Sequence, residues 1–146
     1  MPRSPRSILA AVAVVAALGT APAHADTRGC SGPLDGPAFC TFELQPGDTR
    51  VVLHIEVPYG GPPVFAHVIC CALLDPVTGE PLRDPRSGGP VYWPTSEGIC
   101  GSSWGVCEVP ISPPPDGVPY DHTVTCEARG EHPDDPIQGT WSCLPR

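Results

Sequence analysis

The 146-residue sequence contains no lysine and no asparagine, and its only methionine is the first residue. The absence of lysine excludes Schiff-base chemistry and a P-loop lysine, and the absence of asparagine excludes N-glycosylation. Only eight residues are basic, all of them arginine, against sixteen acidic ones. Because such a chain would repel nucleic acid and anionic lipid, we expect neither of them as a partner.

Long apolar segments are also scarce, since only residues 8–18 form an unbroken run. This run is too short to cross a bilayer, which takes about 20 residues. Arginines precede it and an Ala-x-Ala sequence ending at Ala25 follows it, which is the pattern of a secretory signal. We predict a signal peptide over residues 1–25 and one secreted acidic domain over 26–146, without membrane contact after cleavage. The richness in Ala, Gly, Pro and Arg is typical of bacteria with GC-rich genes.

Cysteine is abundant, and an even number of cysteines in an exported chain indicates disulfide bonds. The eight cysteines, which we expect to form four disulfides, are Cys30, Cys40, Cys70, Cys71, Cys100, Cys107, Cys126 and Cys143. Four bridges at about 2 to 4 kcal/mol each would rival the whole net stability of a domain, about 5 to 15 kcal/mol. No C-x-x-C sequence occurs, so we expect neither a zinc site nor any other metal or cofactor.

The pairing of the cysteines is only partly constrained by the sequence. Cys100 with Cys107 and Cys126 with Cys143 are the pairs that we expect from their proximity in the chain. Successive side chains of a strand point to opposite faces of a sheet. We therefore expect no bond between Cys70 and Cys71.

The 22 prolines largely exclude long helices, because a proline inside a helix costs about 3 kcal/mol. Alternating apolar and polar residues instead predict half-buried strands, whereas residues 64–74 are apolar on both faces and predict a central strand. The alternating segments are 40–44, 51–57, 105–111, 121–128 and 140–144. Residues 80–94, rich in Gly and Pro, are expected to be irregular, and we identify no internal repeat.

Six or seven short strands without helices between them predict an all-β fold, an antiparallel sandwich or barrel stapled by disulfides. The segment Val124-Thr125-Cys126-Glu127-Ala128 looks like a core strand of an immunoglobulin domain. We therefore expect an immunoglobulin-like sandwich.

Two motifs could carry chemistry, and we expect neither to do so. Gly101-Ser102-Ser103-Trp104-Gly105 matches the G-x-S-x-G motif of hydrolases, in which a helix must follow the serine, but Cys107 and Pro110 follow here. His54 and Glu56 would share one strand face, but two ligands do not make a metal site. We expect no catalytic residue, and hence no enzyme.

Two short segments resemble the secreted subtilisin-inhibitor family. Residues 125–134, TCEARGEHPD, are similar to its Cys-to-Gly-x-His-Pro loop, and residues 71–77, CALLDPV, are similar to its reactive loop. This resemblance implies a serine-protease inhibitor whose reactive bond joins Leu73 to Leu74. The two segments appear in the opposite chain order from that of the family.

The leading functional hypothesis is a secreted non-enzymatic binding module for an extracellular protein or other ligand. Tyr92 and Trp93 lie among Gly and Pro residues in a predicted loop. Aromatic residues on stiff loops can anchor a partner at low entropic cost. We take these two residues as the candidate binding residues, and the protease inhibitor as the alternative function.

Overall fold

The computed structural model describes residues 28–93 and 95–146, so the predicted signal segment, residues 1–25, lies outside the described residues. The described part is all β and contains no helix. Its eight strands are β1 (Cys30–Leu34), β2 (Ala38–Glu43), β3 (Val51–Glu56), β4 (Val64–Cys70), β5 (Thr95–Cys100), β6 (Val106–Ile111), β7 (Thr123–Gly130) and β8 (Gly139–Pro145). The prediction of an all-β chain is confirmed.

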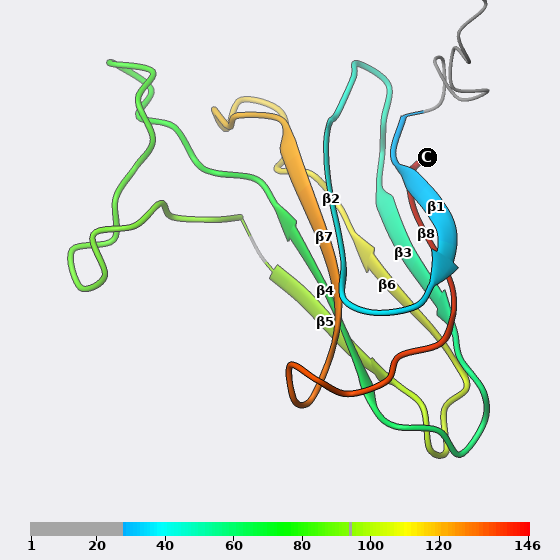
Figure 1. The fold of residues 1–146 in the computed structure, drawn as a ribbon. Helices are drawn as coiled ribbons and strands as arrows, with labels where there is room; N and C mark the ends of the chain where they lie inside the picture. The colour runs from blue at the N-terminus through cyan, green and yellow to red at the C-terminus, as the bar shows by residue number, and fades with distance from the viewer. Residues whose placement is uncertain (1–27, 94) are drawn as a thin grey trace, which may run out of the picture.

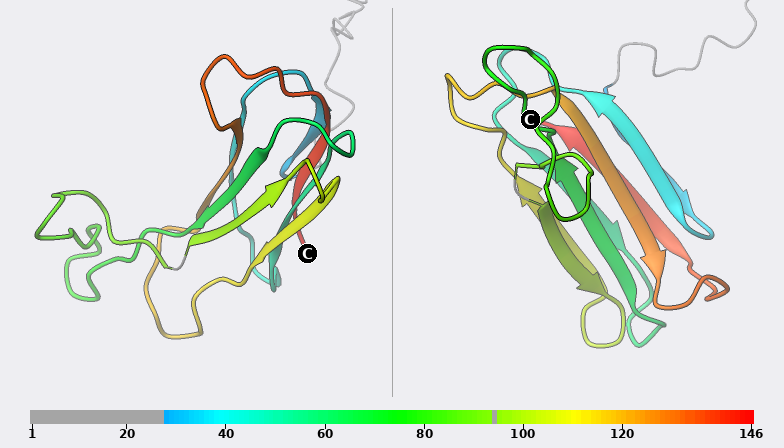
Figure 2. Two further views of the ribbon diagram at one scale, coloured as in Figure 1. Left: turned by 90° about the horizontal axis from the view of Figure 1, so that it is seen from below. Right: turned by 90° about the vertical axis from the view of Figure 1, so that its left-hand side faces the viewer.

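The strands form two four-stranded antiparallel sheets, in the orders β1-β8-β3-β6 and β2-β7-β4-β5 (Figure 1). Figure 2 shows the two sheets as separate layers, which make a sandwich. The first strand pairs with the eighth, the second with the seventh, the third with the sixth and the fourth with the fifth. One long hairpin rolled up on itself produces this pairing, which is the strand order of a jelly roll.

This strand order differs from the immunoglobulin-like type that we expected from the sequence. In immunoglobulin domains the first two strands are neighbours in one sheet. Here β1 and β2 lie in opposite sheets. The alternation of apolar residues predicts which face of a strand is buried, and it is the same in every sandwich. It therefore does not distinguish one order of strands from another.

The core lies between the two sheets and is apolar, with no buried charged or polar residue among the described residues. The alternation of side chains along the strands produces this separation. In β3, Val51, Leu53 and Ile55 point inward, while His54 and Glu56 point outward. Three disulfides cross this core and join a strand of one sheet to a strand of the other. They are Cys30–Cys40, Cys100–Cys107 and Cys126–Cys143. The last two pairs confirm the sequence prediction.

The fourth disulfide joins Cys70 to Cys71, so the prediction of no bond between these two residues is wrong. Strand β4 ends at Cys70, so the rule that successive side chains point to opposite faces does not extend to Cys71. The other six cysteines already pair across the sandwich. The peptide bond between the two residues is cis, and both side chains are fully buried.

Residues 72–93 leave the sandwich between β4 and β5 as an arm with two turns (Figures 1 and 2). The two turns have the same hydrogen bonds. The backbone oxygen of Asp75 accepts from the N–H of Gly79, and that of Asp84 accepts from the N–H of Gly88. Each aspartate carboxylate also accepts from the N–H two residues further along the chain. The arm is therefore regular, whereas we expected much of it to be irregular.

The regularity reflects a nine-residue repeat, so the expectation that the chain has no internal repeat is wrong. Residues 73–81, LLDPVTGEP, and residues 82–90, LRDPRSGGP, share Leu, Asp-Pro, Gly and Pro at equivalent positions. The backbone oxygen of Leu73 accepts from the N–H of Leu82, and that of Leu82 accepts from the N–H of Val91. The N–H of Leu73 in turn donates to the oxygen of Val91, which closes a ring of hydrogen bonds among these three equivalent positions.

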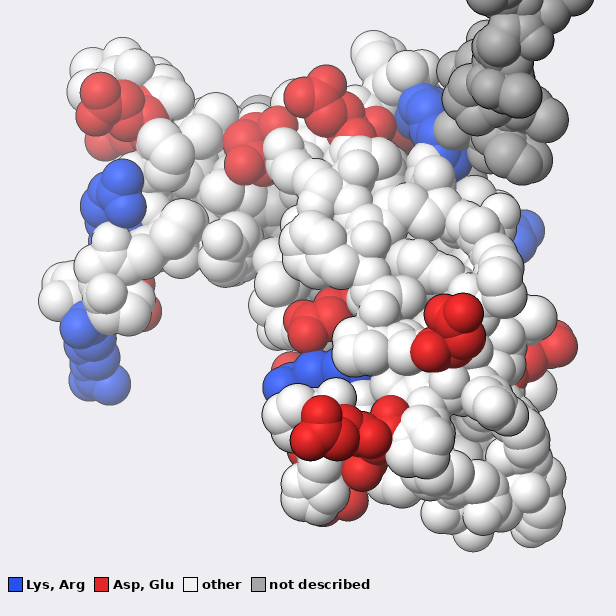
Figure 3. Space-filling model, viewed as in Figure 1, with Lys and Arg blue, Asp and Glu red and all other residues white. Residues whose placement is uncertain are grey.

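Acidic side chains are spread over the visible face in separate groups, and basic side chains appear on the arm (Figure 3). This scatter gives no single strongly charged patch on that face. Within the described ranges, no helix has the length and apolar character needed to cross a membrane.

Candidate functional site: a groove on one sheet

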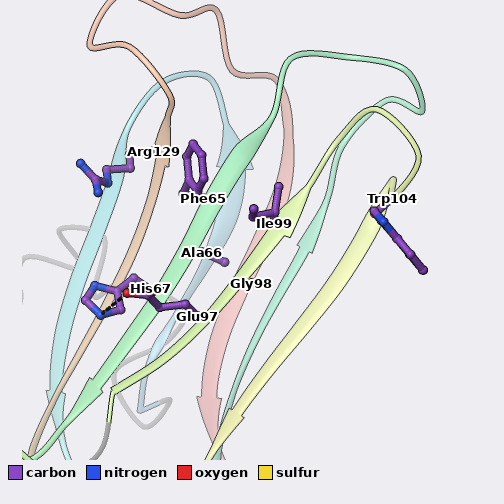
Figure 4. A pocket seen from close by; sticks show the side chains of 8 residues that line it. All are labelled: Phe65, Ala66, His67, Glu97, Gly98, Ile99, Trp104 and Arg129. Atoms are coloured by element: carbon purple, nitrogen blue, oxygen red, sulfur yellow. Dashed lines mark ion pairs between the residues drawn. The ribbon is translucent and has the colours of Figure 1, made fainter.

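A groove of about 740 Å³ opens on the outer face of the β2-β7-β4-β5 sheet (Figure 4). Its lining comes from three strands and one turn. The lining residues are Phe65, Ala66 and His67 of β4, Glu97, Gly98 and Ile99 of β5, Trp104 of the β5–β6 turn, and Arg129 of β7. The site is therefore built on paired strands of one sheet, with the turn at its border.

The alternation of side chains along the strands explains which of these residues face the groove. In β4, Phe65 and His67 point outward and alternate with the buried residues Val64, Ala66 and Val68. The register of the sheet places Phe65 opposite Ile99 on β5 and opposite Arg129 on β7. A row of side chains thus crosses three strands on the solvent side of the sheet.

A second row lies one pleat further along and carries charge. His67 stands opposite Glu97 on β5 and Glu127 on β7. His67 Nε2 lies 3.6 Å from Glu97 Oε1, and Arg129 Nε lies 3.8 Å from Glu127 Oε1. His67 and Arg129 therefore each have a carboxylate neighbour, and Arg129 keeps 65% of its side chain exposed.

Large apolar side chains at the groove remain in contact with solvent. Ile99 is 54% exposed and Trp104 is 70% exposed. Scattered apolar residues are common on protein surfaces, but a group that borders a hollow is typical of a ligand-binding site. Figure 4 shows Arg129, Phe65, Ile99 and Trp104 following one another across the sheet.

Gly98 forms part of the floor of the groove, and its missing side chain has a structural cause. A Cβ atom at this position would lie 2.8 Å from Cγ2 of the buried Val109 on β6. Glycine therefore lets the two sheets approach each other beneath the groove.

The two candidate binding residues from the sequence, Tyr92 and Trp93, do not line the groove. They lie where the arm returns to the sandwich, and Trp93 N–H donates to the oxygen of Cys71. Tyr92 is 46% exposed and Trp93 is half-buried. Their role in binding stays a prediction. The groove itself had one signal in the sequence, because residues 64–74 are apolar on both faces, and the sandwich buries only one face of β4, which leaves Phe65 on the other.

The Leu73–Leu74 bond, the reactive bond implied by the resemblance to subtilisin inhibitors, lies in the arm and is half-buried. Its backbone is hydrogen-bonded on both sides. Leu73 donates to Val91 and accepts from Leu82, and Leu74 donates to the oxygen of Pro119. The segment is already extended in isolated β-bridges, and a protease would have to break these hydrogen bonds in order to pair with its backbone.

The G-x-S-x-G motif lies in the tight turn between β5 and β6. Gly101 and Trp104 hydrogen-bond to each other across the turn, and Ser103 lies between them. The Cys100–Cys107 disulfide closes this loop at its base. A strand follows the serine, whereas a nucleophile elbow requires a helix.

His54 lies on the outer face of the other sheet, between two carboxylates. Its Nε2 is 3.0 Å from Glu56 Oε1, and its Nδ1 is 3.2 Å from Glu108 Oε1. The hydrogen bond to Glu56 raises the pKa of His54 above its ordinary value; partial burial opposes this shift, and the bond to Glu108 reinforces it. In the part of the chain that the structure describes, no cluster of three or more His, Cys, Asp and Glu residues could hold a metal ion.

This arrangement predicts a pH-dependent contribution to stability. Because the pKa of His54 is higher in the folded chain, protonated His54 stabilises the fold below its unfolded pKa of about 6.5. The stabilisation is lost as the pH rises through the folded pKa. We expect His54→Gln to lower the free energy of unfolding more at about pH 5.5 than at about pH 8.5. Denaturant titrations of both proteins at the two pH values measure this difference.

A variant that keeps the histidine provides the control. Glu56→Gln combined with Glu108→Gln removes both carboxylates, so it should abolish the same pH-dependent contribution. An equal effect of His54→Gln at both pH values would contradict the assignment.

No protein-family model matches the chain, and comparisons with curated proteins and with solved structures find no match either.

Proposed function

We propose that the chain is a secreted, non-enzymatic binding module that holds an extracellular ligand in the groove on the β2-β7-β4-β5 sheet. The observation that carries this proposal is the exposure of Ile99 and Trp104 at the border of a 740 Å³ hollow. Complete burial of one such side chain is worth about 1.5 to 3 kcal/mol, so a ligand that covers these residues gains stabilisation. The fold alone assigns no ligand, because one architecture serves many functions.

The disulfides agree with a secreted location. Four bridges link the eight cysteines, and such bonds persist in oxidising compartments. Three of them join the two sheets, so the groove stands on a cross-linked support. A rigid support lowers the entropic cost of binding, because few side chains and loops must become ordered.

The geometry supports binding better than protease inhibition. An inhibitory bond has to present free backbone N–H and C=O groups to the protease, and the backbone around Leu73 and Leu74 is already hydrogen-bonded to other parts of the chain. The groove needs no such rearrangement.

The proposal is tested by retention of a labelled mature domain, residues 26–146, on two fractions of the producing culture: washed cell walls and immobilised proteins of the culture medium. We expect at least one fraction to retain the domain. Ile99→Ser should lower the retained amount about fivefold, which is the loss for an interface residue that contributes about 1 kcal/mol. Phe39→Ser is the matched control, because Phe39 is exposed on the same sheet but outside the groove.

Thermal unfolding of each variant separates lost binding from lost folding. Tyr92→Ala combined with Trp93→Ala is measured in the same assay, because the sequence predicts that these residues bind the partner. If the double variant at Tyr92 and Trp93 is no longer retained while the Ile99→Ser variant still is, the binding site is at the base of the arm. Retention on neither fraction would contradict the proposed function.

A further inference from the structure

The groove side chains stand in two rows that run across the strands. Ile99, Phe65 and Arg129 form one row, and Figure 4 shows it continuing to Trp104. Neighbouring strands lie about 4.8 Å apart, so contacts along a row repeat at this spacing. An extended chain of pyranose sugars advances by a similar length with each unit. A peptide strand instead presents its same-face side chains about 6.7 Å apart, which does not match the rows.

The backbone of the groove floor is already paired on both sides in β4 and β7. Strand β4 pairs with β5 on one side and with β7 on the other. A peptide that binds by adding a strand to a sheet needs a free edge. A ligand that lies over β4 and β7 must therefore be recognised by side chains, and among the described strands of the groove only β5, at the end of the sheet, has an edge without a strand partner.

The charges of the groove favour a neutral ligand. Arg129 lies 3.8 Å from the carboxylate of Glu127, and Glu97 adds a second carboxylate beside His67, so the groove has no excess of positive charge that would attract an anion. A carboxylate can accept a hydrogen bond from a ligand hydroxyl group, and a guanidinium can donate one to it, while the two charged groups remain close to each other. The mature chain carries six arginines against sixteen acidic residues, which disfavours an anionic ligand.

The apolar part of the groove complements the other surface of a sugar. A pyranose ring has C–H groups on its faces and hydroxyl groups around its rim. Trp104, 70% exposed, and the half-buried Phe65 offer aromatic surface to the C–H faces, and Glu97 and Arg129 of the same groove can form hydrogen bonds with hydroxyl groups. We infer that the ligand is a neutral glycan laid across β7, β4 and β5. This inference rests on the proposed function and names its ligand class.

Titration of the disulfide-bonded mature domain with defined oligosaccharides tests the inference. The probes are the hexasaccharides of cellulose, chitin, β-1,3-glucan, mannan and xylan, with a heparin hexasaccharide as the anionic control. We expect calorimetry and NMR to show binding of at least one neutral probe and no binding of the anionic one. Trp104→Ala should weaken this binding about tenfold, and Glu97→Gln about fivefold.

Two controls make each outcome decisive. Phe39→Ala removes an equally exposed aromatic residue from the same sheet outside the groove, so it should leave the affinity unchanged. Glu97→Gln preserves the size of the side chain, so it still tests the site if Trp104→Ala fails to fold.

If no neutral probe binds, or if binding is unaffected by Trp104→Ala and Glu97→Gln, the glycan inference is wrong. Retention on medium proteins that Ile99→Ser lowers would then leave the proposed function intact with a protein as ligand. If no neutral probe binds and no retention that Ile99→Ser lowers is observed, both the inference and the proposed function are wrong.

Discussion

Replacing Cys126 and Cys143 together by alanine is expected to lower the free energy of unfolding by about 3 kcal/mol. This disulfide closes a loop with a sequence separation of 17 residues and joins β7 to β8 through the core. Both side chains are fully buried, so their loss also leaves space that the core must fill. Denaturant unfolding followed by fluorescence measures the change, and mass spectrometry verifies that the other three bonds have formed.

The Cys100–Cys107 bond provides the comparison. It spans a separation of only seven residues, and Cys107 is half-buried. Removing it restricts the unfolded chain less, so replacement of both residues by alanine should cost about 2 kcal/mol. An equal or larger loss for this pair would show that the stabilisation does not follow the length of the closed loop.

Gly98→Ala is expected to lower the free energy of unfolding by about 1 to 3 kcal/mol, the usual cost of overpacking a core. The new methyl group would meet Cγ2 of Val109 at 2.8 Å. Val109 is buried, and its β-branched side chain has little rotamer freedom with which to move aside. The strand or the sheet must therefore shift. Thermal and denaturant unfolding measure the loss.

A double-mutant cycle isolates this contact. Val109→Ala alone leaves a cavity, and the methyl group of Gly98→Ala fills part of it, so the double variant should lose less than the sum of the two single changes. Gly89→Ala is the control, because a Cβ there meets only Ser87 Oγ at an ordinary 3.5 Å. Additive losses within about 0.3 kcal/mol would contradict the close approach of the sheets at Gly98.

Five of the eight strands overlap alternating segments of the sequence, and β4 overlaps the segment that is apolar on both faces. Strands β1 and β5 were missed. Strand β1 contains Gly32 and Pro33, and β5 contains Gly98, all residues that disfavour strands. These segments are extended because β8 and β4 pair with them, and no local pattern encodes that pairing.

The arm shows a different kind of omission. Its nine-residue repeat is evident in the amino-acid sequence of residues 73–90, so the sequence alone suffices to predict it. The Asp-Pro and Gly positions then predict two equal turns, because aspartate carboxylates cap turns and glycine adopts positive φ. The missed signal was local, unlike the signals for β1 and β5.

The candidate site depended more strongly on the fold. Phe65 and His67 could be assigned to a strand from the sequence, but their neighbours Ile99, Glu97 and Arg129 come from distant parts of the chain. The sequence directed attention to Tyr92 and Trp93 because they are aromatic residues in a loop. The groove forms only because the register of the sheet brings residues of β4, β5 and β7 together.

The sequence by itself determined the all-β class, the exclusion of long helices and the bonds Cys100–Cys107 and Cys126–Cys143. Proline content, the period-two alternation and short separations between cysteines are properties of neighbouring residues, so they can be read along the chain. Tertiary structure decided the jelly-roll order, the Cys70–Cys71 bond and the groove. These features depend on which distant segments pair, and the free energy of that pairing belongs to the whole packed sandwich.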